Sequence, residues 1–151
     1  MTRLFHEWWD RRGLTGRLTT DQQSQLLAYL LLLERWNQQI NLTGSLLTSN
    51  PDAALDRLIL EPVEFQLKFQ LTPRRVLDIG SGSGSPALPF LICCPSAELT
   101  MIEARQKKAV FLREASRAIN LNTRVEACRF EDFAQQSHPV SYTHLTLPTK
   151  A

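Results

Sequence analysis

The front of the chain carries apolar positions at helical spacing. Apolar side chains recur at this spacing over residues 4–14, and the run LLAYLLLL occupies Leu26–Leu33. The pattern predicts a short amphipathic helix followed by a longer, thoroughly buried one. Thr20, with Gln23 three residues later, matches the capping-box pattern. The longer helix is therefore predicted to begin there and to run to about Ile40.

Polar residues and prolines divide the rest of this region. Asn41, in the segment NLTGS, is predicted to cap the end of the long helix. Asn50 before Pro51 predicts the start of another helix, because an Asn side chain caps free N–H groups and proline is tolerated in a first turn. Pro62 is expected to end or kink that helix. Residues 1–72 are therefore predicted to form an N-terminal helical region.

The pattern changes at Pro73. The segment RVLDI is typical of a buried strand, and ELTMIE and TRVEAC are predicted as a second and a third strand. Helical patterns separate the three segments. Strands that alternate with helices predict an α/β fold with parallel pairing and right-handed crossovers. The second crossover helix is expected to turn one apolar face inward, formed by Ala109, Phe111, Leu112, Ala115 and Ile119. Residues 73–139 are predicted to form this α/β unit.

A glycine-rich turn joins the first predicted strand to the helix after it. Asp78 ends the strand, and the turn contains Gly80, Ser81, Gly82 and Gly84. Such a turn brings backbone N–H groups and a helix N-terminus up to a ligand. The carboxylate of Asp78 suits a ligand with a positive sulfonium or ammonium group and disfavours a phosphate. Glu103, at the end of the second strand, is suited to accept hydrogen bonds from both hydroxyls of a ribose.

Two other interpretations of this turn stay open at this point. Nicotinamide-dependent oxidoreductases use a G-x-G-x-x-G spacing and also bind a ribose, whereas the spacing here is G-x-G-x-G. The glycines are also compatible with a tight turn in any α/β protein. The order of strand, Asp78, glycines, helix, strand and Glu103 favours S-adenosylmethionine as the cofactor over both.

Three blocks of the sequence resemble the RsmG family, also called glucose-inhibited division protein B, the 16S ribosomal RNA guanine-N7 methyltransferases. The blocks are LLLLERWNQQINLTG, VLDIGSGSGSPALPF and MIEARQKKAVFL. The first is the most family-specific, through Trp36, Asn37, Asn41, Leu42 and Thr43. The resemblance implies a Rossmann-like class I methyltransferase fold dependent on S-adenosylmethionine, with the N-terminal helical region as a cap.

The resemblance also implies roles for single residues. S-adenosylmethionine would lie over the glycines, with Glu103 on its ribose and with Arg129 and Glu131 near its adenine. The implied partner is 16S ribosomal RNA or the small ribosomal subunit, with basic residues such as Lys107 and Lys108 on RNA phosphates. No catalytic residue is assigned, because the residues that face the target base are expected to lie beyond residue 139. N7 of guanine is itself a nucleophile, so catalysis would consist mainly of positioning.

The chain departs from the family pattern at several positions. Ser85 and Ala87 stand where the family usually has an aromatic residue and a glycine. The segment DRLILEP, Asp56–Pro62, stands where the family commonly reads H-x-x-D-S-L. These departures leave open how the helix after the glycines begins and whether a substrate-facing histidine is replaced.

Composition limits the class of protein to which the chain can belong. A content of 43% hydrophobic and 21% charged residues with a net charge of +2 is typical of a globular protein. The longest apolar run is too short to span a bilayer, and the histidines have no metal-ligand spacing, so neither a membrane nor a metal is expected. Three cysteines without pairing or metal-type spacing are expected to be reduced, buried thiols of a cytoplasmic protein. Phe5, Trp8 and Trp9 are predicted to pack in the core rather than to stack on bases.

The last segment, VSYTHLTLPTKA at residues 140–151, fits no element and resembles the translation of a transposon-end adapter. The natural sequence is therefore expected to stop near Pro139, which would leave the α/β domain incomplete at its C-terminus. Such a chain is expected to be inactive on its own. A non-enzymatic truncated fragment is the remaining alternative, because missing strands reduce the buried surface that offsets chain entropy.

Overall fold

A three-stranded parallel sheet lies at one side of the architecture. The computed structural model describes residues 1–136. Its strands are β1 (Arg75–Ile79), β2 (Glu98–Ile102) and β3 (Thr123–Glu126), hydrogen-bonded in the order β1-β2-β3. Asp78 is paired in register with Met101, and Leu99 with Thr123. The predicted strands and their parallel pairing are confirmed.

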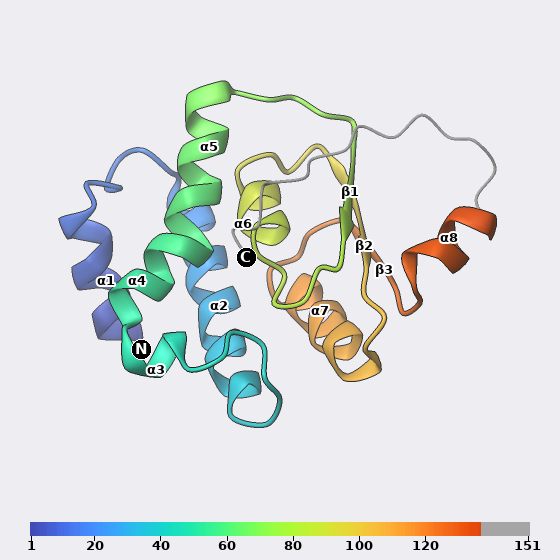
Figure 1. The fold of residues 1–151 in the computed structure, drawn as a ribbon. Coiled ribbons are helices and arrows are strands. Elements are labelled where there is room, and N and C mark those ends of the chain that lie inside the picture. Colours follow the sequence, from blue (N-terminus) through green and yellow to red (C-terminus); the bar gives the residue numbers. More distant parts are fainter. Residues whose placement is uncertain (137–151) are drawn as a thin grey trace.

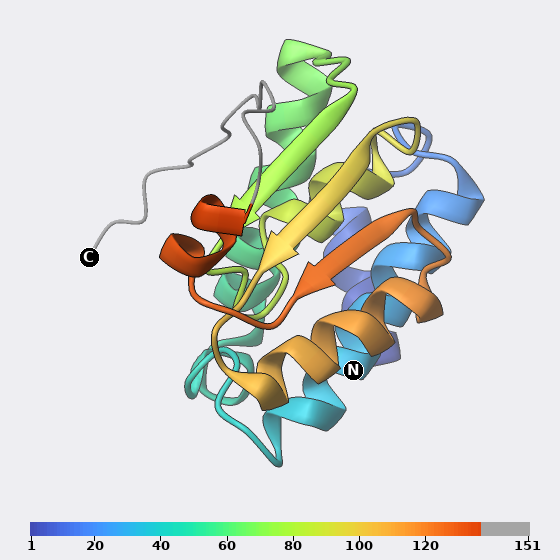
Figure 2. The same ribbon diagram turned by 90° about the vertical axis from the view of Figure 1, so that its right-hand side faces the viewer.

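The two crossover helices lie between the sheet and the N-terminal helices (Figure 1). These crossovers are α6 (Ala87–Ile92) and α7 (Gln106–Ala118). The five residues predicted for the inward face of α7 are all buried. The last described helix, α8 (Phe130–Gln136), lies on the opposite side of the sheet, and Figure 2 looks onto the sheet from that side.

The N-terminal region is helical throughout, as predicted. It contains α1 (Thr2–Arg11), α2 (Thr20–Asn37), α3 (Leu46–Ser49), α4 (Pro51–Leu55), the π-helical turn η1 (Asp56–Leu60) and α5 (Glu61–Phe69). The side chains of Phe5, Trp8 and Trp9 are at most 2% exposed, which confirms their placement in the core. Asn50 caps α4 by accepting a hydrogen bond from the backbone N–H of Ala53 at 3.1 Å, also as predicted.

The capping box of α2 is one residue earlier than predicted. The Thr19 side chain accepts from the backbone N–H of Gln22 at 3.1 Å, and the Gln22 side chain accepts from the N–H of Thr19 at 2.9 Å. The segment TTDQQ contains two Thr–Gln pairs with the same spacing, so the local pattern does not choose between them. The observed register turns Leu26, Tyr29 and Leu33 into the core.

The end of α2 also differs from the prediction. The helix ends at Asn37 rather than near Ile40. The Asn37 side-chain oxygen accepts from the backbone N–H groups of Leu42 and Thr43, both at 3.0 Å. Asn41 does not cap the helix and accepts instead from the N–H of Gly44 at 2.7 Å. Asn37 therefore folds the turn that follows the helix.

Pro62 does not end the helical stretch that begins at Pro51. The chain passes from α4 through the π-helical turn η1 into α5, and Pro62 lies in the first turn of α5. Because the helical path is continuous with η1, Pro62 removes one N–H donor from this path without ending it. The wider hydrogen-bond spacing of η1 just before the proline is the local adjustment that lets the helical path continue.

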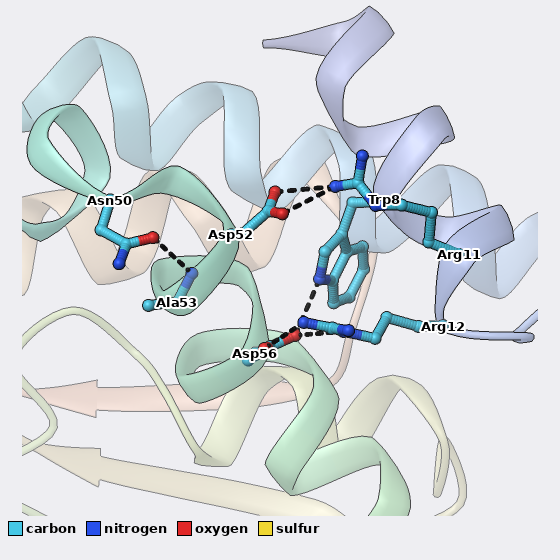
Figure 3. Close-up of polar contacts among 7 residues, drawn as sticks. All are labelled: Trp8, Arg11, Arg12, Asn50, Asp52, Ala53 and Asp56. Atoms are coloured by element: carbon cyan, nitrogen blue, oxygen red, sulfur yellow. Dashed lines mark hydrogen bonds and ion pairs between the residues drawn. The ribbon is translucent and has the colours of Figure 1, made fainter.

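Helix α1 is held against α4 and η1 by a polar cluster (Figure 3). Asp56 accepts from the indole N–H of Trp8 at 2.9 Å and from the guanidinium group of Arg12 at 2.7 and 2.5 Å. Arg11 donates two hydrogen bonds to the carboxylate of Asp52 at 2.8 and 2.9 Å. This cluster, named here the α1 clamp, joins segments more than forty residues apart in the chain.

One hydrophobic core unites the helical region and the sheet. It includes Trp8 from α1, Leu30 from α2, Ile59 from η1, Val76 from β1 and Phe111 from α7. The arrangement is consistent with the predicted Rossmann-like α/β fold carrying N-terminal helices. The boundary near residue 72 is thus a change of secondary structure within a continuous core, and the domain division itself stays a prediction.

Two smaller expectations concern the described residues, and a third falls outside them. All three cysteines are free thiols; Cys94 is buried as expected, whereas Cys93 and Cys128 are only half-buried, which corrects the expectation. Within residues 1–136, no helix combines the length and the apolar character needed to cross a membrane. The segment 140–151, interpreted above as an adapter translation, lies outside the described residues.

Candidate functional site

The glycine turn sits where β1 ends and is anchored to the end of the neighbouring strand. The backbone N–H groups of Gly80 and Ser81 both donate to the carbonyl of Ile102, at 2.8 and 3.2 Å. The N–H of Gly84 donates to the carbonyl of Ser81 at 2.7 Å. Residues 80–84, named here the glycine loop, therefore form a compact turn at the carboxyl edge of the sheet, where open α/β sheets bind ligands.

Gly84 cannot be replaced without displacing its neighbours. Its φ of +83° lies in the left-handed region, and a Cβ atom there would approach Leu88 Cδ1 to 2.7 Å and Leu112 Cδ2 to 3.2 Å. The glycine thus lets the loop pack directly on α6 and α7. At Gly80, by contrast, a Cβ would meet no atom within 4 Å, so this glycine leaves its space open.

Glu103 is bound to the loop itself. Its carboxylate is only 7% exposed. One oxygen accepts from the backbone N–H of Gly82 at 2.9 Å, and the other accepts from the N–H of Arg105 at 2.8 Å. A carboxylate offers about four acceptor positions, so about two remain for the ribose hydroxyls proposed from the sequence. Glu103 therefore joins the glycine loop to the start of α7, in addition to any contact that it makes with a ligand.

An open pocket of about 180 Å³ lies at the carboxyl ends of the strands. Its lining consists of Ile79, Gly80, Ile102, Ala104, Cys128, Arg129, Phe130 and Glu131. The pocket brings together three of the predicted site residues, Gly80, Arg129 and Glu131, from segments some fifty residues apart. Its apolar lining suits a flat aromatic ring, and the two charged side chains stand at its exposed end.

Asp78 lies apart from that pocket. It borders a small closed space of about 10 Å³, which is room for about one water molecule, together with apolar side chains such as Phe65 and Phe90. One carboxylate oxygen of Asp78 is buried and has no hydrogen-bond partner among residues 1–136. Burial raises the pKa of this carboxyl; hydrogen bonding by Ser81 opposes the shift, and the charge of Glu103 adds to it.

The remaining predicted site residues hold the loop in shape. Ser81 is 3% exposed, and its hydroxyl donates to the backbone carbonyl of Asp78 at 3.2 Å. The N–H of Gly82 donates to the carboxylate of Glu103, and Gly84 lies where a larger residue would meet Leu88 and Leu112. None of these three residues lines the open pocket, whereas Gly80, Arg129 and Glu131 do.

Sequence reasoning missed two hydrogen bonds that join the chain around the glycine loop to the helical region. The hydroxyl of Tyr29, in α2, donates to the backbone carbonyl of Ser83 at 2.8 Å. The hydroxyl of Ser85 donates to the backbone carbonyl of Leu58, in η1, at 2.8 Å. Ser85 had been noted only as a departure from the family pattern. Tyr29 carried no local signal beyond its position in an apolar run.

The block around Trp36, the most family-specific part of the resemblance, joins α2 to α7. The Trp36 indole N–H donates to Glu114 at 2.9 Å, and its ring packs edge-on against Phe111 with centroids 6.0 Å apart. Arg35 also pairs with Glu114. Asn37 folds the next turn, as described above. The block therefore supports the packing of the helical region on the crossover helix that starts at the pocket.

The described residues hold no cluster of three or more His, Cys, Asp or Glu side chains that could bind a metal ion. The chemistry of this site therefore rests on the glycine loop, the open pocket and three carboxylates, those of Asp78, Glu103 and Glu131. This set of groups suits an uncharged or cationic ligand with hydroxyl groups better than a phosphate.

Comparison with known proteins identifies one family. Residues 22–145 match the family described as rRNA small subunit methyltransferase G, GidB. A protein named Ribosomal RNA small subunit methyltransferase G from Xylella fastidiosa (strain 9a5c) is 40% identical over 122 residues, 80% of this chain and 54% of the relative. The protein of the same name from Xanthomonas oryzae pv. oryzae (strain KACC10331 / KXO85) is 37% identical over 137 residues, 89% of this chain and 61% of the relative. The chain spans a little more than half the length of these relatives.

Proposed function

Because the chain belongs to the family of rRNA small subunit methyltransferase G, we propose that its glycine loop and open pocket bind S-adenosylmethionine. The reaction we propose is methylation of N7 of a guanine in 16S ribosomal RNA. Since the chain spans 54% of the first relative, methyl transfer is proposed for a protein of full family length. The proposed substrate places such a protein with the ribosomes in the cytoplasm.

The open pocket at the carboxyl ends of the strands is the observation that carries this proposal. Its apolar lining, with Ile79, Ile102 and Phe130, fits an adenine ring. Glu131 stands at the rim, where a carboxylate can accept a hydrogen bond from the adenine amino group. Glu103 accepts two backbone hydrogen bonds, which leaves about two acceptor positions for ribose hydroxyls.

The unpartnered oxygen of Asp78 supports a cationic cofactor. A buried carboxylate without a partner is costly unless a positive charge or a donor lies near it. Asp78 lies behind the glycine loop rather than in the open pocket, so it would act on the positive end of the ligand through its charge or through one bridging water. A dinucleotide, whose pyrophosphate is negative, gains nothing from this carboxylate.

The proposed reaction needs little proton transfer from the protein. S-adenosylmethionine, when bound, supplies a methyl group on a positive sulfur, and N7 of guanine has a lone pair that can attack it. The protein's part is to hold the donor at a fixed place beside the loop and to keep water from it. Arg105 and Lys107, both exposed where α7 begins, are suited to contact RNA phosphates beside the pocket.

Binding calorimetry with S-adenosylhomocysteine and with NADH tests the proposal. We expect the chain to bind S-adenosylhomocysteine and to bind NADH at least about tenfold more weakly, a difference of about 1.4 kcal/mol. The variant Arg129→Ala is expected to weaken binding of S-adenosylhomocysteine. Arg124→Ala is the matched control, because Arg124 is exposed on β3 and pairs with Glu126 rather than lining the pocket. Tighter binding of NADH would overturn the proposal and restore the oxidoreductase alternative.

A further inference from the structure

The chain around the glycine loop is joined to the helical region by two hydroxyl groups, those of Tyr29 and Ser85, to which no motif assigns a part in ligand binding. We propose that Tyr29 and Ser85 are positioning residues, which fix the loop in the shape that binds its ligand. The inference rests on the proposed function, because it takes the glycine loop as part of the cofactor site. Its consequence is that the N-terminal helices contribute to cofactor affinity without touching the cofactor.

Tyr29 fixes the central peptide of the loop. Its side chain is fully buried, and its hydroxyl donates to the Ser83 carbonyl at 2.8 Å. The Ser83 carbonyl and the Gly84 N–H belong to one planar peptide unit and point in opposite directions. Since the Gly84 N–H donates to the Ser81 carbonyl at 2.7 Å, this peptide is held at both ends. Rotation of the loop at that point therefore requires two hydrogen bonds to break.

Ser85 joins the end of the loop to the π-helical turn η1. Its hydroxyl donates to the backbone carbonyl of Leu58, a residue of η1, at 2.8 Å. The bond therefore ties the chain just after the loop to the helical region. Because η1 is also held by the α1 clamp through Asp56, the contact rests on a fixed support.

The loop has a physical need for such support. Three of its residues, Gly80, Gly82 and Gly84, have positive φ values of 72°, 51° and 83°. Glycine has more conformational freedom to lose than any other residue, so a glycine loop without support would have to be ordered when the ligand binds. Holding the loop in advance removes that cost and raises affinity. Glu103 supports the loop from the sheet, and the two hydroxyls support it from the helices.

Tyr29→Phe tests the inference, because it removes one hydroxyl and keeps the ring. Ser116→Ala is the matched control: the buried Ser116 hydroxyl also donates to a backbone carbonyl, that of Leu112, at 2.8 Å, but within α7. Two quantities are measured on the full chain, the affinity for S-adenosylhomocysteine by calorimetry and the hydrogen-exchange rate of the Gly84 amide without ligand. We expect Tyr29→Phe to weaken affinity about fivefold and to speed exchange by a similar factor.

The control separates positioning from general stability. Tyr29→Phe and Ser116→Ala are expected to lower the melting temperature equally, whereas only Tyr29→Phe changes affinity and loop exchange. Ser85→Ala is expected to behave like Tyr29→Phe. If Tyr29→Phe matches Ser116→Ala in both affinity and exchange, the positioning role is overturned. If the unsubstituted chain does not bind S-adenosylhomocysteine, the proposed cofactor site fails, and the Gly84 exchange rate alone still decides whether Tyr29 holds the loop.

Discussion

Two aspartates show how the helical region and the loop region of this molecule use the same side chain differently. Asp56, in the α1 clamp, accepts from both Trp8 and Arg12 (Figure 3), and its side chain is 33% exposed. Asp78, at the end of β1, has a buried oxygen without a partner among the described residues. Hydrogen bonding and charge from Arg12 lower the pKa of Asp56, whereas burial raises the pKa of Asp78.

The contrast separates a group that stabilises the fold from one that is costly to the fold. The Asp56 carboxylate has hydrogen-bond donors within the chain, so replacing it should lower the free energy of unfolding. Asp78 has one oxygen without a partner within residues 1–136, and natural proteins keep such groups mainly where a ligand or a reaction uses them. The comparison therefore predicts opposite effects from similar substitutions, one on unfolding and one on ligand binding.

The largest effect is expected from Asp56→Ala. The substitution removes the acceptor for the buried Trp8 indole N–H, and an unpaired buried donor costs about 1–3 kcal/mol. We expect the free energy of unfolding, measured by urea titration, to fall by about 2 kcal/mol. The affinity of the folded chain for S-adenosylhomocysteine should change less than about twofold.

Asp52→Ala is the matched control for that experiment. Asp52 also accepts from an α1 arginine, but the Arg11–Asp52 pair is half-exposed on both sides. Exposed pairs contribute about 0–1 kcal/mol, so Asp52→Ala should change stability much less than Asp56→Ala. Equal losses from the two variants would show that the burial of Trp8 does not matter and would break the comparison.

The next effect in size is expected from Asp78→Asn. The amide keeps the shape of the side chain and removes its charge. If the carboxylate attracts a cationic cofactor, affinity for S-adenosylmethionine should fall about tenfold, or about 1.4 kcal/mol. The free energy of unfolding should be unchanged or higher, because a buried charge without a partner has been removed.

The thioether analogue of the cofactor sharpens this experiment. S-adenosylhomocysteine lacks the positive sulfur but keeps the ammonium group, so Asp78→Asn should weaken its binding less than that of S-adenosylmethionine. Equal affinity of Asp78→Asn and the unsubstituted chain for S-adenosylmethionine would contradict a ligand role for Asp78.

Local signals predicted the elements of this fold well. The strand RVLDI is observed as Arg75–Ile79, and the inward face of α7 is buried as its spacing indicated. The first two strands were found because apolar runs with a buried strand's length are short-range patterns. The two shifts, at the start of α2 and at its end, arose where neighbouring residues of the same type offered equal local choices.

The site was only partly predictable, because its supports are long-range. Gly80, Arg129 and Glu131 do line one pocket, and that placement follows from parallel strands ending at one edge. The bond from Tyr29 to Ser83 spans 54 residues and that from Trp36 to Glu114 spans 78. No pattern of single positions encodes such contacts. The use of Glu103 as an acceptor for the loop's own N–H also depends on three-dimensional packing.

The smallest predicted effect is the pH dependence that distinguishes the two aspartates. The folded pKa of Asp56 lies below its ordinary value of 3.8, so its contribution is present above that value and is lost as the pH falls through the folded pKa. The folded pKa of Asp78 lies above 3.8, so the folded state takes up this proton first and gains stability as the pH falls from neutral toward that value. Urea unfolding of the unsubstituted chain, Asp56→Ala and Asp78→Asn from neutral pH to about pH 3 measures the pH-dependent contribution of each aspartate to stability.

The stability difference between a variant and the unsubstituted chain should change with pH in opposite directions for Asp56→Ala and Asp78→Asn. The stability lost in Asp56→Ala should stay constant from neutral pH down to about the ordinary carboxyl pKa and shrink below it. The charge-dependent share of that loss should stay below about 1 kcal/mol, since Asp56 is one-third exposed and solvent screens its charge. The advantage of Asp78→Asn should be largest at neutral pH and disappear as Asp78 takes up its proton. Parallel pH profiles for the two variants would mean that Asp78 has a hidden partner and that the two regions use aspartate in the same way.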